Sequence, residues 1–397
     1  MMRLKHVAKM AAGGTPSVDD PAMWAEGGLP WVAITDMTRS SSVVATARTV
    51  TAEGIASKRL PVGDPGTLLF AMYASLGSMA VLGTRATWNQ AVLGIEPKSG
   101  MAESRFIRYW LEHLGRDLGA LARSNTQDNL NAEQVGNFPF PVIRLPRQQA
   151  IADYLDAETA RIDAIIDKKR QISMLASERL SSAAEVALES SERVALKRVA
   201  NLLPGYTFPS DHFGPEDSGL RLLRGVNVGV GSLRWDDAVH LIDDGGEYGR
   251  YLLEEGDVVI GMDRPFISGG TRVALLGRGD AGALLVQRVC RIRARSRNHA
   301  AVLRWALASP RFKAHVEPDL TGVSVPHLSE DQIGSFLVPD LPTDRMGPVA
   351  AELNNLEQQI EQLTRTLERQ VELLTEHRQA LITATVTSQL PVPGVAA

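Results

Sequence analysis

The stretch VAAELNNLEQQIEQLTRTLERQVELLTEHRQAL, residues 349–381, decides the organisation of this chain. Its apolar side chains recur every three or four residues, which is the spacing of a coiled-coil seam, with Gln370 as a polar residue in register. A helix over this stretch is about 50 Å long at roughly 1.5 Å per residue. A lone helix of that length would expose its apolar stripe, so the seam needs a partner. The expected seam positions are Val349, Leu353, Leu356, Ile360, Leu363, Leu367 and Leu374.

An earlier stretch, LPRQQAIADYLDAETARIDAIIDKKRQI at residues 145–172, has a similar pattern and is the nearest candidate for that partner. Its pattern is looser, because Glu158 and Lys169 interrupt the apolar spacing. Each helical stretch follows a short proline-containing hinge. The expected seam positions here are Ile151, Leu155, Ile162, Ile165 and Ile172.

The two halves of the chain resemble each other in order, which indicates an internal repeat. The matching segments are Leu4-Lys5 with Leu196-Lys197, Gly28-Leu29 with Gly219-Leu220, residues 66–70 with 256–260, Gln90 with Gln287, and LNAEQVGNF (130–138) with LSEDQIGSF (328–336). We therefore expect a globular part at residues 1–143, a long helix within 144–191, a second globular part at 192–341, and a second long helix with a C-terminal tail at 342–397.

Each globular part is predicted to be α+β. Short apolar runs at Trp31–Ile34, Val258–Ile260 and Leu284–Val289 alternate with glycine and polar turns, as strands do. The apolar spacing of Ser104–Leu121 and Ala300–His315 is closer to that of helices.

Composition is that of a folded globular protein, with 44% apolar and 22% charged residues among 397. The single cysteine, Cys290, cannot form an internal disulfide or supply a zinc site alone, so a cytoplasmic location is expected. The N-terminal residues lack the continuous apolar core of a secretory signal. The uncharged stretch Pro65–Thr84 has the length of a membrane span, but its glycines and its central Ser-Leu-Gly-Ser turn favour two buried strands.

Motifs for catalysis are missing from the sequence. It contains no GxxxxGK[ST] loop, no GxGxxG opening a helix, no HExxH and no GxSxG, and the Asn/Asp-Pro-Pro-aromatic and methyl-donor motifs of amino-methyltransferases are also absent. The eight histidines are scattered without metal-ligand spacing. We therefore expect no catalytic residue, metal or cofactor in this chain.

The net charge of −4 gives no bulk attraction to nucleic acid, so any such binding must be local. One local run of arginines follows Arg288, and its members Arg291, Arg293, Arg295 and Arg297 alternate with other residues and would share one face of a strand. This face could be the solvated side of a half-buried strand or a stripe that tracks phosphates.

The chain resembles the specificity subunit of type I restriction-modification systems over essentially its whole length. The resemblance is carried by residues 145–172 and by LLTEHRQALITATVTSQL (373–390), together with GGTPS (13–17), the strand at 29–36 and Asn89-Gln90-Ala91. Two departures are the second hinge, LPTDRMGPVA, which lacks the usual glutamine, and the first helix, which ends in SSAAEVAL.

The resemblance implies that each globular part is a target recognition domain that reads one half of a split, asymmetric site in double-stranded DNA. The two helices would be antiparallel, would set the spacing of the half-sites, and would dock methyltransferase subunits, two being expected. Those partners would methylate adenine with S-adenosylmethionine, and restriction and motor subunits would complete the complex. This chain would have no cofactor of its own.

Base readout requires arginine for guanine and asparagine or glutamine for adenine. The candidates are Arg39, Arg85, Asn89 and Gln90 in the first globular part and Arg224, Asn227, Arg264 and Arg272 in the second, each of which could equally be an ordinary surface or loop residue.

Two other classes of protein remain open. A stand-alone DNA adenine methyltransferase would need the missing motifs, and a coiled-coil scaffold without a DNA role would leave two similar domains without a purpose.

Overall fold

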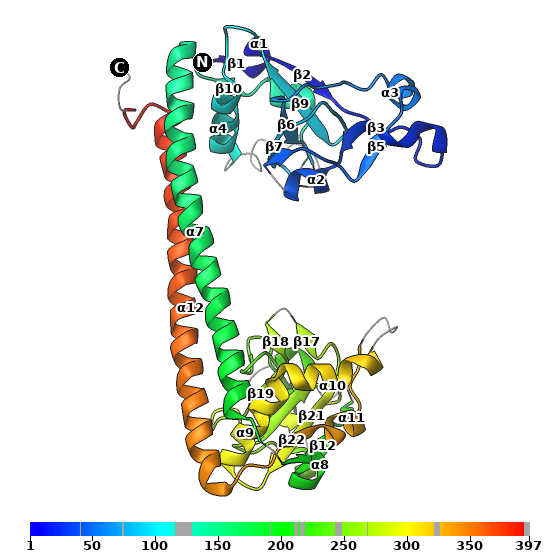
Figure 1. Ribbon diagram of the computed structural model, residues 1–397, viewed down its shortest axis with the longest axis vertical. Helices are drawn as coiled ribbons and strands as arrows, with labels where there is room; N and C mark the ends of the chain where they lie inside the picture. The colour runs from blue at the N-terminus through cyan, green and yellow to red at the C-terminus, as the bar shows by residue number, and fades with distance from the viewer. Residues whose placement is uncertain are drawn as a thin grey trace. The chain divides into compact units, whose positions relative to one another are not determined.

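The structure is a computed structural model that describes residues 1–39, 41–73, 75–115, 129–190, 192–209, 213–214, 219–242, 248–267, 269–320 and 326–392. The chain divides into two compact units (Figure 1). Unit 1 consists of Met1–Lys169 and Arg369–Ala397, and unit 2 consists of Arg170–Glu368. Each unit contains one globular α+β part and a portion of both long helices, so the two units are described separately.

The globular part of unit 1 contains a five-stranded and a three-stranded sheet. The first has the order β2 (Ala8–Ala12), β9 (Val92–Pro97), β6 (Leu68–Ala71), β7 (Met79–Leu82) and β4 (Ser42–Val43), and the second has the order β5 (Arg48–Val50), β3 (Trp24–Val32) and β8 (Thr87–Trp88). Strand β1 (Met2–Arg3) pairs with β10 (Pro139–Phe140). The helices of this part are α1 (Leu4–Val7), α2 (Ile34–Arg39), α3 (Ala52–Lys58), α4 (Ser104–Leu114) and α6 (Ala132–Gly136). Strand β6 is buried on both faces, which explains its unbroken apolar sequence.

Unit 2 repeats this plan with two four-stranded sheets. Their orders are β12 (Ala200–Pro204), β21 (Val289–Ala294), β16 (Val258–Gly261), β19 (Val273–Leu275), and β13 (Phe213–Gly214), β15 (Val239–Leu241), β14 (Leu220–Leu223), β20 (Leu284–Leu285). Strand β11 (Arg193–Ala195) pairs with β22 (Leu337–Pro339), and β17 (Phe266–Ile267) pairs with β18 (Gly270–Thr271). The helices are α8 (Leu196–Val199), α9 (Arg297–Ala308), α10 (Pro310–Leu320) and α11 (Glu330–Ser335).

Matching registers confirm that the two globular parts are repeats of one α+β fold. Ala71 of β6 pairs with Val92 of β9, and Gly261 of β16 pairs with Val289 of β21 in the same antiparallel way. Helices α6 and α11 both begin with a capping box, in which an Asn or Ser side chain and a glutamine three residues later satisfy each other's backbone N–H groups. These boxes lie in the two segments that match in sequence.

One helix prediction needs correction, and a second is tested only in part. The segment Ala300–His315 forms two helices, α9 and α10, because Pro310 lacks the N–H that would continue α9 and begins a new helix. Helix α4 ends at Leu114, and the rest of the helix predicted over Ser104–Leu121 lies mostly outside the described residues. The uncharged stretch Pro65–Thr84 forms strands β6 and β7, as predicted.

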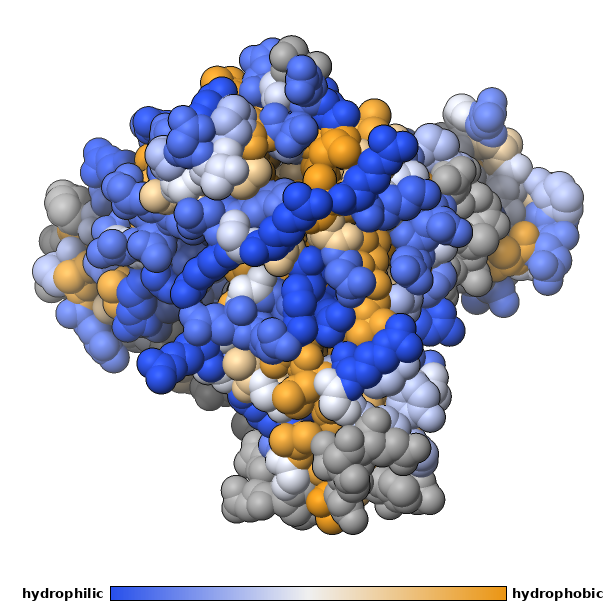
Figure 2. All heavy atoms as spheres, turned by 90° about the horizontal axis from the view of Figure 1, so that it is seen from below, coloured by the Kyte–Doolittle hydropathy of each residue, from blue (hydrophilic) through white to orange (hydrophobic). Residues whose placement is uncertain are grey.

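The described helices offer no candidate for a bilayer span, since none combines sufficient length with sufficient apolar character. The surface seen in Figure 2 is mostly hydrophilic, with apolar side chains exposed between the polar ones. A mixture of this kind is normal for a folded protein surface.

The two long helices are α7 (Leu145–Ala187) and α12 (Thr343–Val386), and they are antiparallel within each unit. In unit 1, Lys169 Nζ donates to Gln370 Oε1 at 2.6 Å, while Arg378 Nε lies 3.1 Å from Asp163 Oδ1. Residue numbers therefore increase along α7 in the direction in which they decrease along α12. In unit 2, the C-terminal part of α7 shares an apolar core with the N-terminal part of α12. The expected antiparallel pair is confirmed.

The seam follows the expected stripe at the ends of the helices and departs from it in the middle. Seven expected positions are at most 9% exposed: Ile151, Leu155, Ile162, Val349, Leu353, Ile360 and Leu367. Leu356 and Leu374 are half-buried. The expectation is wrong for Ile165, Ile172 and Leu363, which are 43%, 46% and 40% exposed. A helix advances by 3.6 residues per turn, so the position four residues after Ile162 faces inward, and Ile166 is 6% exposed.

Gln148 fixes the start of α7 to the globular part of unit 1. Its side chain is 1% exposed, accepts a hydrogen bond from the Glu103 N–H, and donates to the carbonyl oxygens of Met101 and Ile143. Both N–H donors of this buried amide and one lone pair of its oxygen therefore have partners.

The burial difference along α12 predicts unequal effects of two identical substitutions. Leu353→Ala should destabilise unit 2 by about 2–5 kcal/mol, because it leaves a cavity in a packed core. Leu363→Ala should cost less than about 1 kcal/mol, because Leu363 is partly in water already. Urea unfolding of both variants measures the difference, and equal losses would show that the apolar stripe is buried along its whole length.

Gln148→Ala should lower the free energy of unfolding by about 1–3 kcal/mol, because three backbone groups lose their partner. The neighbouring Gln149 is exposed, so Gln149→Ala is the matched control and should leave the stability unchanged. Thermal unfolding followed by circular dichroism compares the two. A neutral Gln148→Ala would mean that water replaces the amide at no cost.

Candidate functional site

A threonine and a glutamine meet at the surface of each globular part. In unit 1 the Thr15 hydroxyl donates to Gln90 Oε1, and in unit 2 the Thr207 hydroxyl donates to Gln287 Oε1 at 3.0 Å. In both pairs the threonine follows the first strand of the main sheet, and the glutamine precedes the strand paired with it. Because each carbonyl oxygen already accepts a bond, each amide presents its two N–H donors to a ligand.

A glycine in each unit allows this close approach. A Cβ on Gly13 would lie 2.0 Å from the Trp88 carbonyl oxygen, and one on Gly205 would lie 2.0 Å from that of Val286. The two glycine N–H groups donate to equivalent strand residues, Val92 in unit 1 and Val289 in unit 2. No larger residue would let the two segments touch, so the glycines bring each threonine to its glutamine.

Beside the Thr207–Gln287 pair, unit 2 has a hollow of about 800 Å³. Four arginines from separate segments line it, namely Arg224, Arg264, Arg272 and Arg288, and we call it the arginine hollow. Three of these were predicted candidates, and the structure brings them together. Asp263 is the acidic side chain among the lining residues, so the hollow has an excess of positive charge.

Hydrogen bonds to the protein orient the guanidinium group of Arg272. Arg272 donates through Nε to the Val228 carbonyl and through Nη1 to the Asp263 carbonyl, each at 2.9 Å. Burial lowers the pKa of Arg272, and the positive charge of Arg234 lowers it further, against the opposing effect of the Asp263 carboxylate. The protein thus compensates this charge incompletely, which favours an anionic or electron-rich ligand.

Arg224 and Arg288 are each paired with a carboxylate. Arg224 Nη2 lies 3.0 Å from Asp237 Oδ2. Arg288 Nη1 lies 3.5 Å from Asp263 Oδ1, which is itself 2.6 Å from His327 Nδ1. A carboxylate that holds one edge of a guanidinium fixes the direction in which the other edge can donate.

Other candidates in unit 2 have structural roles, which corrects their assignment to a DNA surface. Asn227 is 2% exposed and holds a turn, since its side chain accepts from the Arg224 N–H and donates to the Arg234 carbonyl. Arg291 is 6% exposed and donates to Asn201 and to the Arg250 carbonyl.

The arginine stripe is likewise not an open strand face. Arg293 forms ion pairs with Asp257 and Glu254, and the hydrogen bond to Asp257 raises the pKa of Arg293. Arg295 is exposed but lies beyond the end of β21. Arg297 is the first residue of helix α9 and forms an ion pair with Glu255, so it is not on the strand either. Neither a phosphate-tracking stripe nor a fully solvated face describes this arrangement, because packed segments cover Arg291 and supply carboxylates to Arg293.

The predicted candidates of unit 1 have different contacts. Arg85 is exposed, with Nε 3.6 Å from Asp64 Oδ1. Asn89 accepts from the Ala91 N–H and so stabilises a turn, while Gln90 belongs to the Thr15 pair. Arg39 is the last residue of α2, and its side chain lies outside the described residues.

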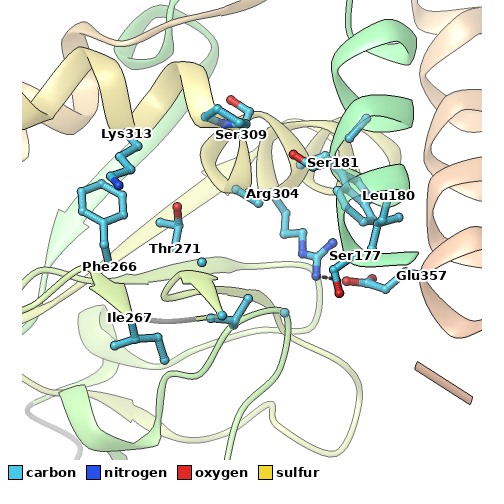
Figure 3. A pocket seen from close by; sticks show the side chains of 18 residues that line it. Ser177, Leu180, Ser181, Phe266, Ile267, Thr271, Arg304, Ser309, Lys313 and Glu357 are labelled. Atoms are coloured by element: carbon cyan, nitrogen blue, oxygen red, sulfur yellow. Dashed lines mark hydrogen bonds and ion pairs between the residues drawn. The ribbon is translucent and has the colours of Figure 1, made fainter. Parts of the chain in front are cut away.

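A second hollow in unit 2, of about 560 Å³, lies beside α7 and the β17–β18 hairpin (Figure 3). Figure 3 shows Arg304 of α9 reaching toward Glu357 of α12, with which it forms an ion pair. This arginine fastens α9 to the long helix, so we assign the hollow a structural role. Within the described residues, no group of three or more His, Cys, Asp or Glu side chains could hold a metal ion.

Sequence reasoning missed the threonine of each pair, and it did not place Gln287, Asp263 or Arg288 among the base-reading candidates. The signal was present in part, because Gln90 and Gln287 align in the repeat and a threonine follows the first glycine in both GGTPS and GYTFPS. Their contact becomes visible only when the strands that carry them are paired.

Sequence comparison identifies residues 1–174 as a type I restriction modification DNA specificity domain. The type I restriction enzyme EcoAI specificity subunit of Escherichia coli is 33% identical over 171 residues, which cover 42% of this chain and only 28% of that relative. The type I restriction enzyme MjaVIII specificity subunit of Methanocaldococcus jannaschii is 23% identical over 326 residues, which cover 77% of this chain and 76% of that relative.

Solved structures share the fold along nearly the whole chain. A chain from a structure of the type I R-M system matches with a TM-score of 0.73 at 16% identity. The match covers 98% of this chain and 97% of that chain. The HsdS subunit from Thermoanaerobacter tengcongensis has a TM-score of 0.52 at 17% identity and covers 98% and 96%. The matched domain and the curated relatives thus make this chain similar to type I restriction-modification specificity subunits, and the solved structures show that it shares their fold.

Proposed function

We propose that this chain is the DNA-recognition subunit of a type I restriction-modification complex in the cytoplasm. Residues 1–143 and 192–341 are the two target recognition domains, and each reads one half of a bipartite site in double-stranded DNA. The helices of residues 144–191 and 342–397 set the spacing of the half-sites and dock two methyltransferase subunits. Restriction and motor subunits complete the complex.

The observation that carries this proposal is the presence of the same surface Thr–Gln pair in both repeats. Thr15–Gln90 and Thr207–Gln287 are built in the same way, yet only the second lies beside the arginine hollow. Glutamine amides and guanidinium groups are the donors that proteins use to contact bases and phosphates. One frame with two different sets of neighbouring side chains suits two half-sites of different sequence.

The catalytic steps are assigned to the partners. The sequence lacks the motifs that hold a flipped adenine and a methyl donor, so S-adenosylmethionine would bind the methyltransferase subunits. A stand-alone methyltransferase would need those motifs. A scaffold without a DNA role would have no use for a surface hollow lined by arginines.

Replacing residues 1–143 by the corresponding domain of a relative should change one half of the recognised sequence and leave the other intact. The physical reason is that each domain has its own core and its own surface Thr–Gln pair. Mapping adenine methylation in DNA treated with the complex of this chain and its methyltransferase subunit reads out both halves. A change in both halves would contradict independent reading, and methylation without sequence preference would refute the proposed function.

Lengthening the first helix should lengthen the unspecified gap between the half-sites. Four residues inserted near Ala176 in α7 add about 6 Å of rise, while each base pair rises about 3.4 Å. The gap should grow by one or two base pairs, and both half-sites should keep their sequence because no base-reading residue moves within its domain. The same methylation mapping gives the gap. An unchanged gap in an active complex would show that the helices dock partners without measuring DNA.

A further inference from the structure

We propose that Arg288 reads a guanine in the half-site recognised by unit 2, with Asp263 holding its guanidinium in place, and that Arg264 contacts a neighbouring phosphate. This inference rests on the proposed function and adds the residues that give unit 2 its specificity. Four independent features of the arginine hollow support it.

The first feature is the backbone at the two arginines. Arg264 and Arg288 have φ values of +44° and +69°, a region in which residues other than glycine are unfavourable. In the described part of the chain two further non-glycine residues share this conformation, and both follow helix ends, where it is common: Arg59 caps α3 and Ser388 follows α12. Arg264 and Arg288 cap no helix. Strained backbone of this kind is enriched at functional sites, so these two positions are candidates for a function.

The second feature is the carboxylate beside Arg288. Asp263 Oδ1 lies 3.5 Å from Arg288 Nη1, and His327 Nδ1 lies 3.3 Å from the same nitrogen. A carboxylate at this distance repels a phosphate but not the edge of a neutral base. Among the described residues, Arg288 Nε and Nη2 have no partner, so one edge of the fork remains for the O6 and N7 acceptors of guanine.

The third feature is the contrast with Arg264. Its side chain is exposed in the same hollow, and it has no carboxylate partner among the described residues. Its backbone N–H donates to the Pro326 carbonyl, which holds the position without engaging the guanidinium group. An unopposed, exposed guanidinium next to a base-reading residue is suited to a phosphate.

The fourth feature is an internal comparison between the units. The Met262 N–H donates to the Arg288 carbonyl in unit 2, and the Met72 N–H donates to the Ala91 carbonyl in unit 1. The Gly261 N–H likewise donates to Arg272, where unit 1 has Ser78. Alanine and serine therefore stand in unit 1 where unit 2 has two of its hollow-lining arginines. The guanine contact should accordingly exist in one half-site only.

The test uses the full chain in complex with its methyltransferase subunit and a DNA library randomised at the half-sites. Arg288→Ala and Arg288→Lys should both relax discrimination at one guanine of one half-site by about 5- to 150-fold, because lysine keeps the charge but loses the bidentate fork. Arg264→Ala should keep the methylated sequence and lower the salt slope of binding by about one. The control, Arg278→Ala, removes an exposed arginine that does not line the hollow and should change neither quantity.

A glycine variant separates recognition from folding. Arg288→Gly relieves the backbone strain at a φ of +69°, so its melting temperature should equal or exceed that of the unchanged chain while discrimination falls as in Arg288→Ala.

Two results would overturn the inference. The first is full sequence specificity in Arg288→Lys together with a reduced salt slope in Arg288→Ala, which would make Arg288 a phosphate contact. The second is a changed base in the half-site read by unit 1, which would exclude the assignment of the contact to unit 2. If the unchanged complex methylates a bipartite sequence, either result rejects this inference alone. If it methylates without sequence preference, the proposed function itself fails.

Discussion

The fold depends on the pairing of two long helices whose apolar stripes cannot remain in water. Within each unit the ends of this pair are also fastened to a globular part. In unit 1, Arg378 of α12 forms ion pairs with Glu112 of α4 and Asp163 of α7, so one guanidinium joins three helices. In unit 2, Trp305 of α9 donates to Asn354 of α12, next to the ion pair of Arg304. Within each unit, packing and polar contacts therefore hold the globular part to its portion of the long helices.

The repeat separates what the fold needs from what recognition needs. Backbone contacts are the same in both units, as the glycine N–H bonds to Val92 and Val289 demonstrate. The side chains around them differ, since Ala91 stands where unit 2 has Arg288. A chain with two copies of one domain thus contains a comparison between its own halves. Positions with the same residue in both halves support the frame, and positions that differ beside the shared Thr–Gln pair are where a difference in target sequence can arise.

The arginine run after β20 shows why local pattern is a weak guide to a binding surface. Alternation along β21 does place Arg291 and Arg293 on one face, as expected. Other segments then cover that face, and Asp257, which is 1% exposed, accepts two hydrogen bonds from Arg293. A buried carboxylate needs a cation, so this arginine stabilises the domain. The arginines that remain open to a ligand come from turns, where strained or irregular backbone turns their side chains outward.

The sequence by itself determined the α+β class, the internal repeat and the two long helices, because periodic apolar spacing and repeated segments are local properties that survive without knowledge of contacts. The antiparallel direction of the helices was implied by the family resemblance. The sequence also placed Arg224, Arg264 and Arg272 among the candidates. Only the tertiary structure showed that these three candidates share a hollow with Arg288, which strand pairing brings close to Arg264. It also decided that Asn227 is buried and that Ile166, rather than Ile165, faces the core. Burial and ion pairing depend on what packs against a residue, and no spacing along one segment contains that information.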